Sequence, residues 1–345
     1  MRRRRGEPVS AALQDVGLTV VNIVVVVSGS LTETLQAGPL LAALSTATGE
    51  PALVACPPAG AEVALGLEGA GEVLAVRGLG GGSAGLGLVR LWSELRRRRL
   101  DVAMVCSEVG AVRAAVYVAA VPRRIGCVSG LSDRLLSDRV PCQVGENRGL
   151  AWASLIGPLA LGTEPAAALF TPGVDATDVA EQLLLSNGVS DGRLLVAIAP
   201  GRGFADGAVA EWAAERYAHL ANSLASRHGA GIILIGDRGD RQAADAMRLD
   251  MAADTIDLCG ELNLATTAAV IARCDLFIAG DTPLLHLAAA VGTPSVGLFG
   301  PTKGRLRAPA GAQHRVVQAI RAADSPITLD PIRVEDVLAS IESSL

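Results

Sequence analysis

The alternation of short apolar runs with longer amphipathic segments is the feature that most constrains the fold of this chain. The runs are rich in Val, Ile, Leu and Ala, and Gly, Pro or Ser separates them from the segments that follow. Runs that are apolar throughout are typical of parallel strands covered by helices on both faces. The expected strands are 20–27, 51–56, 72–76, 101–106, 124–128, 194–199, 231–235, 255–258, 275–279 and 295–299.

The segments between these runs have the Ala-, Leu- and Arg-rich composition of amphipathic helices. Strand and helix therefore alternate through both halves, which is typical of doubly wound α/β domains. With 345 residues the chain is longer than one hydrophobic core usually organises, so we expect two such domains in series. The expected helices are 33–48, 58–67, 86–99, 109–120, 209–228, 238–252, 264–273 and 283–291.

Composition marks a boundary between the two domains. A segment in the middle of the chain is rich in Pro, Gly, Asp and Thr, with a candidate helix at 176–187, and we place the linker there. The expected parts are a basic, disordered tail at 1–18, an N-terminal domain at 19–162, the linker at 163–192, a C-terminal domain at 193–330 and a last helix at 331–345.

Composition also excludes several classes of function. Half of the residues are apolar and 19% are charged, which excludes a disordered chain. Aromatic residues make up only 3%, which argues against a nucleic-acid binder that stacks bases on aromatic rings. The single lysine, Lys303, excludes lysine chemistry elsewhere, and the four histidines form no HxH or HExxH pattern. We therefore expect no metal site.

The charge is distributed unevenly along the chain. Residues 1–165 carry 16 arginines and 14 acids, whereas the rest of the chain carries a net charge of −7. Two clusters, Arg2–Arg5 and Arg96–Arg99, account for half of the arginines in the first part. They are interpreted either as a solvated tail and a polar helix end, or as groups that attract anionic lipid headgroups.

The six cysteines show no paired spacing. Four of them lie in or beside apolar runs, so we expect six buried free thiols and a cytoplasmic protein, without a disulfide framework or a zinc site. The longest apolar run near the start, Ile23–Val27, is too short for a signal peptide or a membrane span. The cysteines are Cys56, Cys106, Cys127, Cys142, Cys259 and Cys274.

The strongest local signal lies between Asp275 and Thr302. A buried strand is followed by Asp281 and Thr282, which suit a helix N-cap, and then by a proline that is tolerated in a first turn. A helix N-terminus at the carboxyl end of a parallel strand favours phosphate groups. His286 lies one turn into this helix. The alternative is a capped core helix with a satisfied histidine.

This stretch resembles the signature of glycosyltransferase family 9, the ADP-heptose:lipopolysaccharide heptosyltransferases. Pro283 stands where that family has glycine, so one backbone N–H is missing. Further similarity covers nearly the whole chain, including the turn Pro122–Gly126 and the residues around Trp212. The matching signature residues are Asp281, Thr282, His286, Leu287, Ala288, Gly292, Thr293, Pro294, Phe299, Gly300, Pro301 and Thr302.

The resemblance implies a GT-B-like α/β fold, in which two Rossmann-like doubly wound parallel-sheet domains face each other across a cleft. The C-terminal domain would bind the nucleotide-sugar donor. The family's phosphate-binding lysine is replaced by Ala210, with Arg202 as the candidate substitute. Asp240, or else Asp237, would bind the donor ribose. The implied donor-binding residues are Gly201, Arg202, Asp240, Asp281, Thr282, Pro283, Leu284 and His286.

The family's catalytic aspartate falls on Glu33 when the chain is aligned through Pro39 and Leu44. Glu33 would then be the general base for the acceptor hydroxyl, with one methylene more than aspartate. The alternative is a first-turn acid that complements the helix dipole.

These implications lead to one expected function. The chain would be an inverting, metal-independent transferase that moves heptose from ADP-heptose to a lipopolysaccharide-core-type glycolipid, with no cofactor and no nucleic acid. It would act as a monomer in the cytoplasm, with peripheral contact to anionic lipids of the inner membrane through the two arginine clusters. The alternatives are a catalytically degenerate member that binds nucleotide-sugar without transfer, and a nucleotide-sugar epimerase of similar fold.

Overall fold

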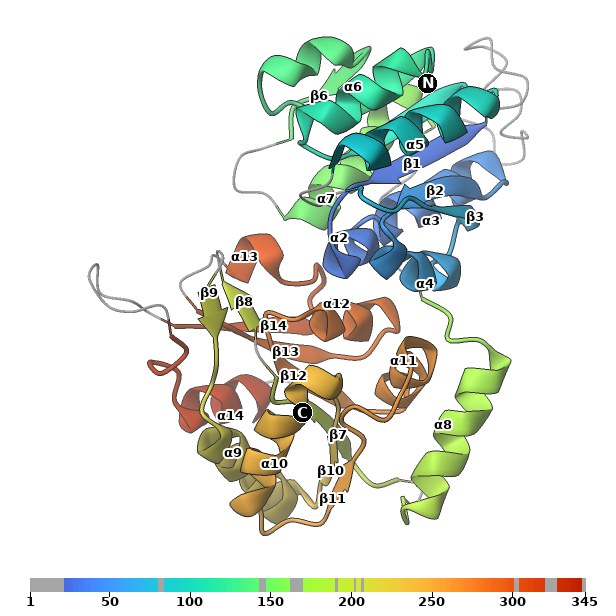
Figure 1. Cartoon of the computed structure of the whole chain (residues 1–345). Helices are drawn as coiled ribbons and strands as arrows, with labels where there is room; N and C mark the ends of the chain where they lie inside the picture. The colour runs from blue at the N-terminus through green and yellow to red at the C-terminus, as the bar shows by residue number, and fades with distance from the viewer. Residues whose placement is uncertain are drawn as a thin grey trace, which may run out of the picture. The chain divides into compact units, whose positions relative to one another are not determined.

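The computed structural model divides into two compact units, Met1–Phe170 and Thr171–Leu345, which are considered separately (Figure 1). The division falls inside the segment 163–192 named as the linker. Among the described residues, no helix is long and apolar enough to cross a membrane. The residues that the structure describes are 22–79, 84–142, 147–161, 170–189, 192–201, 203–205, 208–300, 304–319 and 328–342.

The first unit contains a six-stranded sheet in the order β3-β2-β1-β4-β5-β6, and every pair of neighbours is parallel. The order reverses between β1 and β4, so the carboxyl ends of these two strands flank the point where doubly wound sheets bind ligands. The strands are β1 (Ile23–Val27), β2 (Ala52–Cys56), β3 (Ala70–Ala75), β4 (Val102–Cys106), β5 (Arg123–Cys127) and β6 (Asp138–Val140).

Helices follow the strands of this sheet, and two of them, Ala84–Arg97 and Gly110–Val118, share one core with β1, β2 and β4. The single helix expected at 33–48 is two helices that meet at Ala37, because Pro39 has no N–H to continue the first helix. The helices are α2 (Leu31–Gln36), α3 (Gly38–Thr48), α4 (Pro58–Gly66), α5 (Ala84–Arg97), α6 (Gly110–Val118) and α7 (Arg148–Ala153), with 3-10 turns at Leu131–Leu135 and Ser154–Leu159.

The second unit repeats this design with the sheet order β11-β10-β7-β12-β13-β14, again parallel throughout. Here the order reverses between β7 and β12. The strands are β7 (Leu195–Ala199), β10 (Gly231–Leu234), β11 (Thr255–Asp257), β12 (Leu276–Gly280), β13 (Ser295–Phe299) and β14 (His314–Gln318). A separate antiparallel pair consists of β8 (Gly203–Ala205) and β9 (Ala208–Ala210).

The helices of the second unit follow the expected order with one correction at 209–213. Residues 208–210 form β9, and the following helix begins only at Ala214. Trp212 precedes that helix, where it is buried and its Nε1 donates to the carbonyl of Ile332 at 3.0 Å. The helices are α8 (Val174–Ser186), α9 (Ala214–His228), α10 (Arg241–Leu249), α11 (Leu264–Ala272), α12 (Pro283–Ala290), α13 (Gly304–Arg307) and α14 (Val334–Glu342), with a 3-10 turn at Arg238–Asp240.

The expectation of six free thiols is wrong for two of the cysteines. Cys127 and Cys142 form a disulfide. Cys127 ends β5 in register with Val140 of β6, and Cys142 follows two residues later, so strand pairing brings the two sulfurs together. The remaining four cysteines are free and buried: Cys56, Cys106, Cys259 and Cys274.

Candidate functional site

The N-terminus of α12 lies at the carboxyl end of β12, as the motif predicts. Thr282 is the N-cap residue, with extended backbone angles of φ −121° and ψ 159°, and Pro283 is the first residue of the helix. The Thr282 hydroxyl makes no capping hydrogen bond, although the residue is buried. Among the described residues this hydroxyl has no hydrogen-bond partner at all. Such an atom in a buried position is the kind of group that a bound ligand satisfies.

His286 lies one turn further along α12 and is buried. Burial is the main cause that lowers its pKa to about 4, and the positive charge of Arg307 adds to the effect. The imidazole is therefore neutral near pH 7. Its Nε2 has no partner within the described part of the chain. Thr282, at the N-cap, and His286, in the first turn, therefore both belong to the N-terminal end of α12.

Arg307 brings a positive charge to this helix terminus from α13. Its Nε lies 2.5 Å from Oδ2 of the buried Asp281, and 41% of the arginine side chain is exposed. The sequence did not predict this role for Arg307. The residue lies 26 positions after Asp281, in a four-residue helix that carries no recognisable sequence signal. The Asp281 carboxylate offsets the charge of the guanidinium, so the α12 amides are the groups that make this end of the sheet suited to an anion.

Asp240 lies at the same edge of the sheet, after β10. A Cβ on the buried Gly201 would overlap with the Asp240 carboxylate, so this close approach requires glycine. Asp240 Oδ2 accepts from the N–H of Asp237 at 3.0 Å, and Asp237 itself is exposed. Asp240, Pro200 and Trp212 line a cavity of about 370 Å³.

The structure therefore brings the described donor residues to the carboxyl ends of the central strands of the second sheet, because β10, β7 and β12 are neighbours. Pro283 and Leu284 are half-buried there. Arg202 and Lys303 lie outside the described residues, and for Ala210 only the backbone of β9 is described. The roles of all these residues in donor binding stay predictions.

Glu33 lies in the first turn of α2, directly after the carboxyl end of β1. Its Oε1 accepts from Nη1 of Arg148 at 2.6 Å, and a quarter of its side chain is exposed. The negative charge of Glu33 contributes to a raised pKa of the Cys106 thiol, which is due first to burial. Cys106 ends β4, so the carboxylate lies where the strand order of the first sheet reverses.

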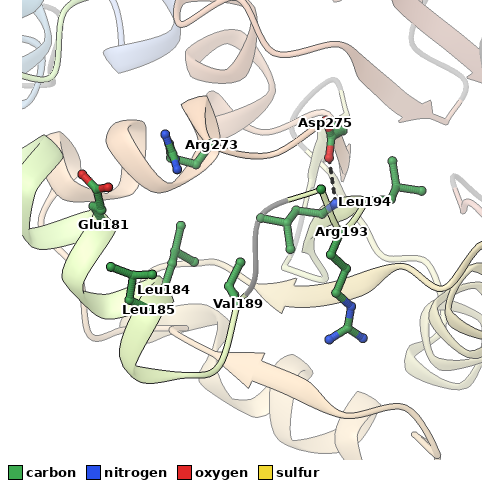
Figure 2. A pocket seen from close by; sticks show the side chains of 10 residues that line it. Glu181, Leu184, Leu185, Val189, Arg193, Leu194, Arg273 and Asp275 are labelled. Carbon is green, nitrogen blue, oxygen red and sulfur yellow. Dashed lines mark hydrogen bonds between the residues drawn. The ribbon is translucent and has the colours of Figure 1, made fainter.

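A second cavity of about 370 Å³ lies at the opposite edge of the second sheet, beside α8 (Figure 2). Its lining includes Glu181, Arg193, Arg273 and Asp275. Asp275 Oδ2 accepts from the N–H of Leu195 at 2.8 Å, so this carboxylate is a hydrogen-bond partner of the first residue of β7. None of the predicted site residues lines this cavity, and parallel sheets bind ligands at the other edge.

The arginine cluster Arg96–Arg99 is partly neutralised by its surroundings. Arg98 lies 2.5 Å from both Glu72 and Glu94, while Arg96 lies over the ring of Trp92. Arg2–Arg5 lie outside the described residues. In the part of the chain that the structure describes, no three His, Cys, Asp or Glu side chains come together as a metal site would require.

Comparison with known proteins places this geometry in context. Residues 88–327 match the family described as glycosyltransferase family 9 (heptosyltransferase). The chain is 28% identical over 243 residues to lipopolysaccharide heptosyltransferase 2 of Salmonella typhimurium, which covers 67% of this chain and 68% of that protein.

Two solved structures share the fold of this chain. A glycosyltransferase family 9 protein from Veillonella parvula has a TM-score of 0.80 at 18% identity, covering 94% of this chain and 96% of that one. An E. coli heptosyltransferase solved with ADP has a TM-score of 0.71 at 17% identity, covering 94% and 100%. These similarities confirm the expected GT-B-like class of two doubly wound α/β domains.

Proposed function

This chain belongs to glycosyltransferase family 9 and is a glycosyltransferase, and we propose that it transfers heptose from ADP-heptose to a lipopolysaccharide-core-type glycolipid. The similarity to the lipopolysaccharide heptosyltransferase of Salmonella supports the sugar and the acceptor, and the ADP in the E. coli structure supports the nucleotide. We place the donor in the second unit and the acceptor in the first.

The arrangement at α12 is the observation that carries this proposal. Thr282 Oγ1 and His286 Nε2 are buried polar atoms without partners among the described residues, at the N-cap and in the first turn of α12. The Arg307 guanidinium, paired with Asp281, lies beside the same helix terminus. A diphosphate would receive hydrogen bonds from these groups and from the helix amides, and the same groups would stabilise the charge on departing ADP. We therefore propose transfer without a metal ion or cofactor.

The reaction would proceed as a single displacement. The carboxylate of Glu33 accepts the proton of the acceptor hydroxyl while that oxygen forms a bond to C1 of the heptose. The bond from C1 to the β-phosphate oxygen breaks, and its electron pair leaves with ADP. Attack from the face opposite the leaving group inverts the configuration at C1. Asp240 would bind the ribose, and Arg202 would supply a second positive charge to the phosphates.

The degenerate alternative is not favoured, because the relatives from Salmonella and E. coli are heptosyltransferases. The lysine that the family uses at the donor phosphates is replaced by Ala210, and we propose Arg202 as the residue that supplies the cation. Contact with anionic lipids remains part of the proposal. In the described part of the chain it would depend on Arg96, Arg97 and Arg99, whose side chains are exposed.

The test is turnover by the purified full chain with ADP-heptose and a heptose-free lipopolysaccharide-core acceptor. We expect ADP release that depends on the acceptor and that persists in EDTA, with inverted anomeric configuration in the product by NMR. ADP-sugar binding without ADP release would support the degenerate alternative. Loss of turnover in EDTA that Mg²⁺ or Mn²⁺ restores would contradict the metal-independent mechanism.

A further inference from the structure

The carboxylate of Glu33 is held between residues from two distant parts of the first unit. We propose that Gly29 and Arg148 are positioning residues for Glu33, which together fix its carboxylate where the acceptor hydroxyl is deprotonated. This inference rests on the proposed function, in which Glu33 is the general base. Neither residue belongs to the signature that identified the family.

Gly29 provides the space that the Glu33 carboxylate occupies. It lies between β1 and α2, and a Cβ at this position would overlap with Oε2 and Cδ of Glu33. The backbone of Gly29 is outside the left-handed region, so its conformation does not require glycine. The side chain of Glu33 folds back over the main chain after β1 and occupies the space that a Cβ at position 29 would take.

Arg148 holds the other oxygen of the carboxylate. Its Nη1 donates to Glu33 Oε1 at 2.6 Å, and its guanidinium carbon lies 5.9 Å from the ring centre of Trp152, one turn further along α7. A planar guanidinium between a carboxylate and an aromatic ring has a defined orientation.

The start of α7 is itself anchored against α2. The side chain of Asn147 caps α7 by accepting from the N–H groups of Gly149 and Leu150. A Cβ on Gly149 would lie 3.5 Å from the carbonyl oxygen of Gln36, which shows how closely the two helices approach. Arg148, the first residue of α7, is thereby fixed relative to α2 and Glu33.

These contacts explain how a glutamate can work where the family has an aspartate. The additional methylene gives the side chain one more rotatable bond, so an unrestrained glutamate would spread over more positions than an aspartate. Gly29 lets the longer side chain fold back, and Arg148 holds it there. Displacement of a reacting group by about 1 Å can lower a rate by about 10²-fold.

The experiment disturbs the two positioning residues separately. Gly29→Ala puts a methyl group where the carboxylate lies, and Arg148→Ala removes its partner. We expect kcat to fall by about 10- to 100-fold in each variant while the KM for the donor changes by less than about twofold. Arg148→Lys should keep more activity than Arg148→Ala, and added guanidinium ion should partly restore Arg148→Ala but not Glu33→Gln.

Matched controls separate positioning from general damage. Gly157→Ala adds a methyl group at a glycine of the same unit with no atom within 4 Å, and Arg227→Ala breaks an exposed ion pair with Glu342 at the end of α9. Both should keep wild-type kcat. ADP affinity and thermal melting of every variant report whether the chain is folded.

A double variant tests whether the positioning residues act through Glu33. In the Glu33→Gln background, Arg148→Ala should cause no further loss of kcat. Two outcomes would overturn the inference while the proposed function stands. One is that Arg148→Ala lowers kcat equally in the wild-type and Glu33→Gln backgrounds. The other is that both Gly29→Ala and Arg148→Ala keep kcat within about twofold of wild type. If Glu33→Gln alone keeps wild-type kcat, the proposed base itself is wrong, and the inference falls with it.

Discussion

At the scale of single residues, burial sets the protonation state of His286. A buried imidazole loses the hydration that favours its charged form, and nearby Arg307 repels a second positive charge. The pKa of His286 falls from 6.5 to about 4, so the ring meets a phosphate as a neutral hydrogen-bonding group. His286 therefore adds no positive charge at α12, and the charge of Arg307 there is paired with that of Asp281.

The lowered pKa of His286 predicts a loss of stability in mild acid. The unfolded chain takes up this proton near pH 6.5, whereas the folded chain does so near pH 4. The stabilisation is therefore complete above pH 6.5 and declines as the pH falls to 4, by roughly 2–3 kcal/mol. Urea unfolding at pH 7, 6, 5 and 4 measures this decline.

The matched variant is His286→Gln, which keeps a neutral side chain at every pH. In this variant the free energy of unfolding should fall less steeply between pH 7 and pH 4. Some of the fall should remain, because burial also lowers the pKa of His314. Equal slopes of stability against pH in wild type and variant would show that His286 takes up its proton at the same pH in the folded and unfolded chain, so that burial does not lower its pKa.

Glu33 gives the residue-scale prediction for catalysis. Glu33→Gln keeps the size of the side chain but cannot accept the proton, so kcat should fall by about 10²–10⁴-fold with donor affinity nearly unchanged. Glu33→Asp restores the family residue and should retain activity, which a purely structural helix acid would not predict. Steady-state kinetics and ADP calorimetry measure the two quantities. A kcat within about threefold of wild type for the Gln variant would identify Glu33 as a dipole-complementing acid.

At the scale of elements, the central strands were predictable, as were the edge strands β3 and β11, whereas the edge strands β6 and β14 were not. β1 and β7 are buried on both faces, so their sequences are apolar throughout and stand out. β6 (Asp-Arg-Val) and β14 (His-Arg-Val-Val-Gln) lie at sheet edges, where half-exposed polar residues are normal, and no apolar run identifies them.

The candidate site also has a part that the sequence predicts and a part that it does not. The cap and first turn of α12 are contiguous in sequence, so one motif predicts them. Arg307 and Arg148 reach Asp281 and Glu33 from 26 and 115 positions away, and only tertiary packing brings them there. Gly29 was missed for a different reason: a glycine after a strand indicates a turn, not the space for a particular carboxylate.

Pro283 gives an element-scale prediction at the start of α12. Proline has no N–H for a diphosphate, so Pro283→Gly should strengthen ADP binding about tenfold, or about 1.4 kcal/mol, through one hydrogen bond to a charged group. The same change should lower stability, because glycine is more flexible than proline in the unfolded chain. Calorimetry with ADP and urea unfolding measure both effects.

The control for this change is Pro58→Gly, at the start of α4 in the first unit. It should lower stability in a similar way and leave ADP affinity unchanged. Unchanged or weaker ADP binding by Pro283→Gly would show that the first amide of α12 does not contact the diphosphate.

At the scale of the whole molecule, each unit has its own sheet and its own core. One core joins β1 and β4 to α5 and α6, and the other joins β7, β10 and β12 to α9 and α14. The proposed base belongs to the first unit and the proposed donor site to the second. Ligand binding can therefore stabilise one core without the other.

Tryptophan fluorescence can report the unfolding of each unit separately. Trp92 and Trp152 lie in the first unit, and Trp212 lies in the core of the second. ADP at 100 times its Kd should stabilise the unit that binds it by about 2.7 kcal/mol. In a variant with Trp92→Phe and Trp152→Phe, the urea transition seen by Trp212 fluorescence should move to higher urea on addition of ADP. In Trp212→Phe, where only the first unit is seen, the transition should stay in place. A shift in both variants would mean that the two units unfold as one cooperative body, and a shift confined to Trp212→Phe would place the nucleotide in the first unit.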